Sequence, residues 1–316
     1  MCCPHYAQDD TVLVYTCCMT IAPITNIPCS LESENLNESL VGSAPKATVW
    51  FALEYTERWG AKAWEESSID AEVRAQVDAQ LAQLPGSRLL LIKQKDRAER
   101  LRLFAAVLGD EPVLYKFELD SYAELAALDL GALVAGAEQY AAHISTEPIV
   151  LVCTNGQRDA CCVLHGITVY NVLHAQFGSA VWESSHHGGH RFAANVLALP
   201  TGRSYGRIRP HNAVSLTQSV LDGHVPLDYC RGYTAWPEPV QAAELLLRQQ
   251  LGYTAAAGVR LLDSQPAGEQ RWVVHLQAGE AEHTLTVERS EGAPVHASCG
   301  DEKTTPTVEF RLQMAE

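Results

Sequence analysis

The sequence predicts an α/β fold that ends in a small α+β appendage. Up to Trp236, short apolar runs typical of buried strands alternate with longer segments that have helical spacing. This alternation is typical of an α/β layer structure. Beyond that point apolar and polar residues alternate with a period of two, as in residues 272–275 and 284–287. Such a period is expected of antiparallel strands with one solvated face.

An N-terminal α/β unit is expected over residues 29–145, after a flexible leader over residues 1–28. Apolar runs define its strands, and apolar residues at helical spacing define its helices. The expected elements are strands at 47–54, 89–92 and 112–117, a helix from a cap at Ser67 or Ser68 to Leu84, and a helix at 121–142.

A second unit is expected over residues 146–235, and the appendage over residues 236–316. The second unit contains strands at 149–153, 180–184 and 192–199 and helices at 159–176 and 212–222. The appendage contains a helix at 238–251 and strands at 259–262, 271–276, 283–288 and 308–312. We interpret the first unit as a degenerate relative of the second, packed beside it.

Charge and cysteine usage restrict the class of protein. The net charge of −15 argues against nucleic acid or an anionic membrane as partner, because both attract Lys and Arg. The ten cysteines occur largely as adjacent pairs, which are poor disulfide staples and favour a reducing, cytoplasmic location. No apolar run is long enough to span a membrane, and no secretory signal pattern begins the chain.

Residues 148–210 concentrate the residue types that bind soft metals. Besides His165 and His174, this stretch contains three cysteines and three closely spaced histidines: Cys153, Cys161, Cys162, His186, His187 and His190. Thiolates and imidazoles are the ligands of zinc and of iron–sulfur centres, whereas carboxylate-preferring metals would not select them. Gly188 and Gly189 allow the backbone to approach a bound group closely.

The spacing of these residues favours a centre larger than one ion. Structural zinc usually takes two tight ligand pairs, and only the histidine half fits that rule, because eight residues separate Cys153 from Cys162. A two-iron cluster with cysteine on one iron and histidine on the other is such a centre. Cys161 and Cys162 point about 100° apart on a helix, so only one of them can face it cleanly.

The pattern Cys153-x8-Cys162 followed by His186-x-Gly188-Gly189-His190 resembles the sucrase/ferredoxin-like family of thioredoxin-like ferredoxins. The resemblance to this family extends to the flanking residues 158–159, 191–195 and 205–207. It covers roughly residues 28–232. It implies a thioredoxin-like ferredoxin domain with a [2Fe–2S] cluster. Cys153 and Cys162 would hold one iron, and His186 and His190 the other. Its spacing selects Cys162 over Cys161, and His187 should point away.

The resemblance implies an electron-transfer protein, a redox carrier rather than a stand-alone enzyme, whose transfer could be coupled to protons. Its donor and acceptor proteins are unknown, and a homodimer is possible. Three further residues are candidates for contacting the ligands rather than the metal: Arg158, Cys161 and Arg191. Two alternatives stay open: a structural zinc protein with the same ligands, and a thioredoxin-like thiol–disulfide protein. The second would favour a Cys-x-x-Cys pair, which the sequence lacks.

Overall fold

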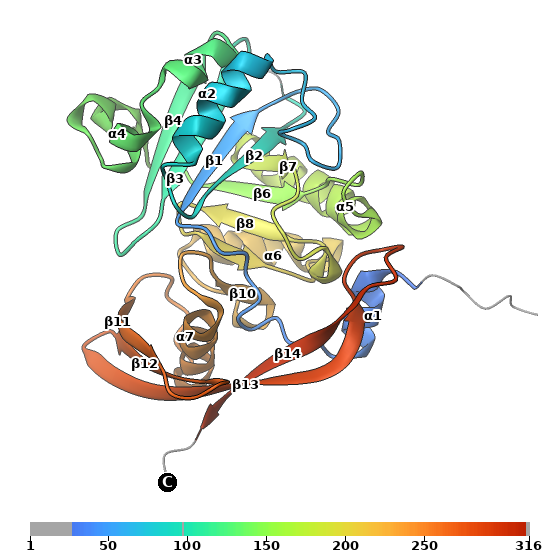
Figure 1. Ribbon diagram of the computed structural model, residues 1–316, viewed down its shortest axis with the longest axis vertical. Coiled ribbons are helices and arrows are strands. Elements are labelled where there is room, and N and C mark those ends of the chain that lie inside the picture. The colour runs from blue at the N-terminus through green and yellow to red at the C-terminus, as the bar shows by residue number, and fades with distance from the viewer. Residues whose placement is uncertain (1–26, 97, 314–316) are drawn as a thin grey trace, which may run out of the picture.

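The computed structural model describes residues 27–96 and 98–313 (Figure 1). Within these residues the predicted α/β fold is confirmed. One large sheet has the strand order β10-β9-β8-β6-β7-β2-β1-β3-β4-β5, and a separate smaller sheet has the order β11-β12-β13-β14. The expected leader lies outside the described residues, apart from its last two positions.

The first half of the large sheet is built around β1. This strand pairs in parallel with β2 and antiparallel with β3, which pairs antiparallel with β4. The elements are β1 (Val49–Glu54), α2 (Ala71–Leu81), β2 (Ser87–Lys93), β3 (Leu101–Val107), β4 (Val113–Leu119), α3 (Tyr122–Ala127), α4 (Leu130–Val134), η1 (Glu138–His143) and β5 (Ile144–Ser145).

The second half repeats this layout around β6. This strand pairs in parallel with β7 and antiparallel with β8, which pairs antiparallel with β9. That this half is a thioredoxin-like ferredoxin domain stays a prediction. The elements are β6 (Ile149–Cys153), α5 (Ala160–Phe177), η2 (Gly178–Ala180), β7 (Val181–Ser184), η3 (His190–Phe192), β8 (Val196–Leu199), β9 (Arg203–Tyr205), α6 (Pro210–Leu221), η4 (Leu227–Tyr229) and β10 (Cys230–Tyr233).

The two halves join edge to edge through β2 and β7. These strands pair antiparallel, with Ile92 opposite Ser184, so the sheet is continuous. One face carries a separate apolar cluster in each half, under α2 and α3 and under α5 and α6. The other face carries a cluster that both halves share, where Phe104 meets the edge of Trp182 at 5.5 Å. The division of the chain near residues 145 and 235 stays a prediction.

Two helix predictions need correction. The cap of α2 is Asp70, whose carboxylate accepts the N–H groups of Glu72 and Val73, and not Ser67 or Ser68. The expected helix at 121–142 is broken into α3, α4 and η1. Asp129 causes the break, because its side chain caps a new helix by accepting the N–H of Ala132 at 2.8 Å.

The appendage packs a helix on a four-stranded sheet, as predicted. Val240, Ala243 and Leu247 of the helix bury their side chains against the sheet. Its elements are α7 (Glu238–Leu251), β11 (Val259–Pro266), β12 (Arg271–Ala278), β13 (Ala281–His296) and β14 (Thr304–Gln313).

The hairpin of β13 and β14 is longer than expected and leaves the small sheet as an arm. Its tip, residues 297–303, lies beside α1 (Cys29–Asn35), as Figure 1 shows. The N–H and the ring Nδ1 of His296 both contact a carboxylate oxygen of Glu32 at 2.8 Å. In the described part of the chain, no helix has the length and apolarity needed to cross a membrane.

Candidate metal centre

The carboxyl ends of β6 and β7 create one edge of the candidate site. These strands are parallel, so Cys153 at the end of β6 and His186 just beyond β7 come to the same edge. Ligands commonly bind at this edge of parallel sheets. The N–H of Cys153 donates to the carbonyl oxygen of Asn195 at 3.0 Å, and this bond fixes the strand end.

Helix α5 brings the second cysteine to the same place. A short loop leads to Asp159, whose carboxylate caps the helix by accepting the N–H of Cys161 at 2.8 Å. The helix then packs tightly on β6, because a Cβ at Gly166 would overlap the carbonyl oxygen of Cys153. Glycine at this position therefore allows the first turn of α5 to place Cys162 against the strand end.

Three of the four predicted ligand side chains converge. The Nδ1 atom of His186 lies 3.7 Å from the Sγ of Cys153 and 3.6 Å from the Sγ of Cys162. All three ligand atoms lie within 4.8 Å of one another. Both cysteines are buried and His186 is partly buried, so the group opens toward solvent on its histidine side.

His190 lies next to this group but is not one of the residues whose ligand atoms converge there. Its ring centre is 5.2 Å from that of His186. Its Nε2 contacts the carbonyl oxygen of Ala297 in the hairpin tip, and lies 3.7 Å from a carboxylate oxygen of Asp159. Its Nδ1 is buried and has no hydrogen-bond partner among the described residues. An Nε2–H that donates to a carbonyl leaves Nδ1 with a free lone pair.

Proton affinities at the site favour the metal-binding forms of Cys153 and His190, but not that of Cys162. The pKa of Cys153 lies well below its usual value because the Cys162 thiol hydrogen-bonds to its thiolate, and the pKa of Cys162 is raised in return. Burial lowers the pKa of His190 and outweighs the opposing effect of Asp159. A thiolate and a neutral imidazole are the forms that bind metal.

Two arginines and an asparagine hold the histidine loop by its backbone. Arg88 donates to the carbonyl oxygen of His187 at 3.1 Å, and Arg231 donates to that of Gly188 at 3.0 Å. Asn195 donates to the carbonyl oxygen of Gly189 at 2.8 Å. Burial lowers the pKa of the fully enclosed Arg231 to about 9. No local motif marks these residues, so sequence analysis did not identify them.

Glycine at position 189 is required by this packing. Its φ is +75°, and a Cβ would overlap the guanidinium of Arg231. His187, one of the residues held in this loop, is fully buried and lies outside the convergent group. Burial lowers its pKa to about 4, so it is neutral.

The residues expected to support the site lie in different surroundings. Arg158 is exposed at the surface. Arg191 is held by an ion pair with Glu38 at 2.7 Å. Cys161 is buried, and its thiol contacts Cys29 and Cys299 rather than the convergent group.

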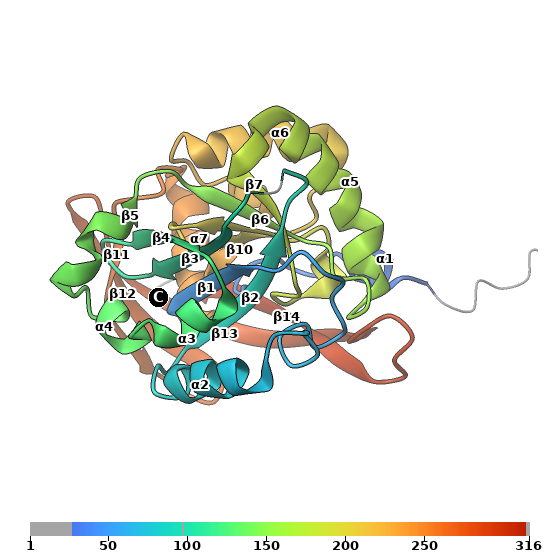
Figure 2. The ribbon, with the colours of Figure 1, turned by 90° about the horizontal axis from the view of Figure 1, so that it is seen from above.

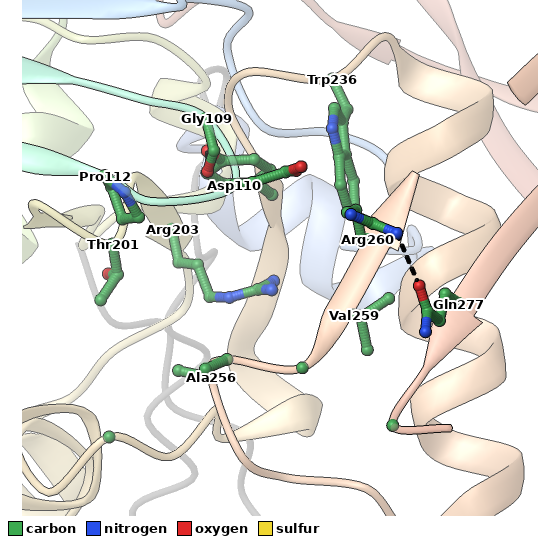
Figure 3. Close-up of a pocket in the computed structure, with 15 residues that line it drawn as sticks. Gly109, Asp110, Pro112, Thr201, Arg203, Trp236, Ala256, Val259, Arg260 and Gln277 are labelled. Atoms are coloured by element: carbon green, nitrogen blue, oxygen red, sulfur yellow. Dashed lines mark hydrogen bonds between the residues drawn. The ribbon is translucent and has the colours of Figure 1, made fainter. Parts of the chain in front are cut away.

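A separate cavity of about 510 Å³ lies between the large sheet and the appendage (Figure 3). Its lining contains two arginines, and both already have partners. Arg260 donates to Gln277 at 2.9 Å, and Arg203 pairs with Glu244. None of the predicted ligand residues lines this cavity, so we assign it no part in the metal chemistry.

Comparison with known proteins identifies one family. The family model described as sucrase/ferredoxin-like matches residues 40–232, which include all four predicted ligands. No curated protein and no solved structure matches the chain.

Proposed function

We propose that this chain, which belongs to the sucrase/ferredoxin-like family, binds a [2Fe–2S] cluster and carries electrons between other proteins. Cys153 and Cys162 would hold one iron, and His186 and His190 the other. The convergence of two buried thiols and one imidazole nitrogen at the ends of parallel strands carries this proposal. Imidazole and thiolate together are typical of two-iron clusters with mixed ligation.

His190 fits the fourth position by its chemistry. In the part of the chain that the structure describes, its Nδ1 is buried without a hydrogen-bond partner, while its Nε2 contacts a backbone carbonyl oxygen. Metal-binding histidines commonly donate their second N–H to a carbonyl or carboxylate, which fixes the tautomer and ring orientation. His186 likewise presents Nδ1 to the two cysteines.

A bound [2Fe–2S] cluster supplies one-electron transfer, and histidine ligands raise its reduction potential relative to four thiolates. The protein contributes burial on the cysteine side and positive charge behind the histidine loop, from Arg88 and Arg231. Because the histidine side is the more exposed, we place electron entry and exit there. The net charge of −15 suits basic partner proteins.

Proton coupling belongs to the same proposal. A histidine that binds metal through Nδ1 keeps its exchangeable proton on Nε2, where its affinity follows the charge of the centre. We expect the midpoint potential to fall as pH rises. Protein-film voltammetry between about pH 6 and 9 tests this expectation, and a flat profile would remove proton coupling while leaving the cluster assignment intact.

Anaerobic purification followed by visible and EPR spectroscopy tests the cluster. We expect a red-brown protein with about two irons and two sulfides per chain. A colourless protein with one zinc at these ligands would support the structural zinc alternative. A metal-free protein that reversibly forms a bond between Cys153 and Cys162 would support thiol–disulfide chemistry.

The adjacent cysteines supply a matched control. Cys162→Ser should abolish or strongly alter the iron spectrum, whereas Cys161→Ser should leave it nearly intact. The two thiols face different groups, with Cys162 against His186 and Cys161 against Cys29 and Cys299. The opposite ranking would exclude Cys162 as a ligand.

A further inference from the structure

Three more cysteine thiols converge on the other side of α5. The Sγ of Cys161 lies 3.5 Å from that of Cys29 and 3.1 Å from that of Cys299, and Cys29 and Cys299 lie 3.5 Å apart. Cys161 is in the opening turn of α5, Cys29 is in α1, and Cys299 is in the hairpin tip. Figure 2 shows α1 beside α5, although more than a hundred residues separate them in sequence.

A carboxylate completes this group. The oxygens of Asp159 lie 3.9 and 4.0 Å from the Sγ of Cys29, and one ligand atom from each of the four residues lies within 4.8 Å of the others. Asp159 is held by the N–H groups of Cys161 and Cys299, each at 2.8 Å, and by the hydroxyl of Ser298 at 2.7 Å. These donors fix its position, and with the nearby His190 they outweigh burial and lower the pKa of Asp159.

We propose that Cys29, Cys161, Cys299 and Asp159 form a second metal site, which binds one Zn²⁺ ion and has a structural role. Three thiolates select a soft or borderline metal, and four protein ligands are typical of structural zinc. Tetrahedral zinc with Zn–S bonds of about 2.3 Å separates its sulfurs by about 3.8 Å. The observed separations are slightly shorter, so small outward shifts of the side chains would admit the ion.

A disulfide explains this arrangement less well. It would join two sulfurs at about 2.0 Å and leave the third thiol buried without a role. All three cysteines are free. Their near-equal mutual contacts, and the carboxylate aimed into the same space, are the features that a single bound ion accounts for together.

The proposed zinc ion would fix the hairpin arm next to the proposed iron–sulfur site. Cys299 belongs to the tip, while Cys29 and Cys161 belong to the body of the protein. Two residues from Cys299, Ala297 offers its carbonyl oxygen to His190. Zinc would therefore hold in place the backbone group that orients His190, and it would keep water from that side. None of the four zinc ligands is a ligand of the proposed iron cluster, so this inference stands without it.

Zinc content and zinc spectroscopy on the intact chain test the proposal. The background carries Cys2→Ser, Cys3→Ser, Cys17→Ser and Cys18→Ser, so that the N-terminal thiols cannot bind zinc. After incubation with one equivalent of Zn²⁺ and removal of excess, we expect about one tightly bound zinc per chain. X-ray absorption at the zinc edge should show about three sulfurs at about 2.3 Å and one oxygen.

Single substitutions then assign the metals to their sites. Cys299→Ser should weaken zinc binding at least about ten-fold and leave the iron content unchanged. Cys153→Ser should have the opposite effect, with loss of iron and retention of zinc. If Cys29→Ser fails to fold, the absorption spectrum of the background protein still reports the ligand set.

Three results would overturn the proposal. The first is a protein that holds no zinc after this treatment. The second is zinc that Cys299→Ser does not affect. The third is a Cys161–Cys299 disulfide, found by mass spectrometry after anaerobic alkylation. Zinc that is lost only in Cys153→Ser would occupy the first site, and would contradict the proposed iron cluster as well.

Discussion

The two halves of the large sheet share one layout, yet among the described residues only the second half brings predicted ligand residues together, namely Cys153, Cys162 and His186. In each half a central strand pairs with a parallel neighbour on one side and an antiparallel neighbour on the other. The central strand β1 ends in Glu54, and its counterpart β6 ends in Cys153. The carboxylate of Glu54 is occupied by an ion pair, because Arg102 of β3 donates to it at 2.8 and 3.0 Å.

The two halves also differ in the length of the connection that follows the central strand. Both following helices begin at an aspartate cap, Asp70 in the first half and Asp159 in the second. The first connection is long, over residues 55–70, whereas the second is short, over residues 154–159. Only the short connection brings the helix start against the strand end. The shared fold therefore does not create the site, which depends on loop length and close packing.

The largest effect is expected where the second half is fastened to the appendage. Glu244 of α7 is fully buried between Arg203 of β9 and Arg248. Glu244→Gln leaves buried guanidinium charge without compensation, and should cost about 3–5 kcal/mol of unfolding free energy. Urea unfolding measures this. The exposed pair of Arg100 and Asp120 in the first half is the control, and Asp120→Asn should cost less than about 1 kcal/mol.

The same carboxylate predicts the response to acid. Burial alone would raise the pKa of Glu244, but its pairing with Arg203 and Arg248 outweighs burial and lowers the pKa below 4.5. Its stabilisation is therefore complete above about pH 4.5 and is lost as pH falls through the lowered pKa. Hydrogen exchange should show the contact between α7 and β9 opening in this range. Equal loosening of the first half at the same pH would count against Glu244 as the cause.

Gly166→Ala tests the close packing of α5 on β6. The added Cβ would overlap the carbonyl oxygen of Cys153, so the helix must move and carry Cys162 away. We expect a loss of about 1–3 kcal/mol of unfolding free energy together with most of the bound iron. Gly109→Ala in the first half is the matched control, because a Cβ there meets no atom within 4 Å. Full iron content in Gly166→Ala would show that iron binding does not depend on the close packing of α5 against β6.

Glu54→Gln should affect stability without affecting iron. It removes the ion pair that closes the first half's strand end, and the guanidinium of Arg102 also lies over the ring of Trp182, at 4.2 Å from its centre. We expect a loss of about 1–2 kcal/mol, measured by urea unfolding, because part of the hydrogen bonding survives in the amide. Iron content should equal that of the unchanged protein. A parallel loss of iron would mean that the first half supports the cluster through Arg102.

The sequence predicts best what depends on neighbours along the chain. The buried strands and the helix of the appendage follow from local periodicity, and Cys153, Cys162 and His186 stand out because they share one stretch. Cys29 and Cys299 meet Cys161 only through tertiary packing, and no spacing rule indicates that contact. The helix expected at 121–142 illustrates the opposite error, since the cap at Asp129 competes locally with a continuous helix.

The smallest expected effect concerns the support that the first half gives to the histidine loop. Arg88 of β2 reaches across the junction with β7, donates to the carbonyl oxygen of His187, and lies over the ring of Trp50. Arg88→Met keeps the length of the side chain but removes the hydrogen bond and the charge. We expect a loss of about 1 kcal/mol of unfolding free energy, and retained iron with a lower midpoint potential, because a nearby positive charge favours the added electron.

Arg100→Met is the control for this change. It removes an equal charge from an exposed arginine of the first half, which pairs with Asp120 rather than with the loop. Voltammetry and EPR on both variants separate the contact from the net charge. An equal potential shift in the two variants would assign the effect to overall charge. A shift confined to Arg88→Met would show that the first half of the sheet tunes the midpoint potential of the proposed cluster in the second half. The contact responsible would be the hydrogen bond from Arg88 to the carbonyl oxygen of His187.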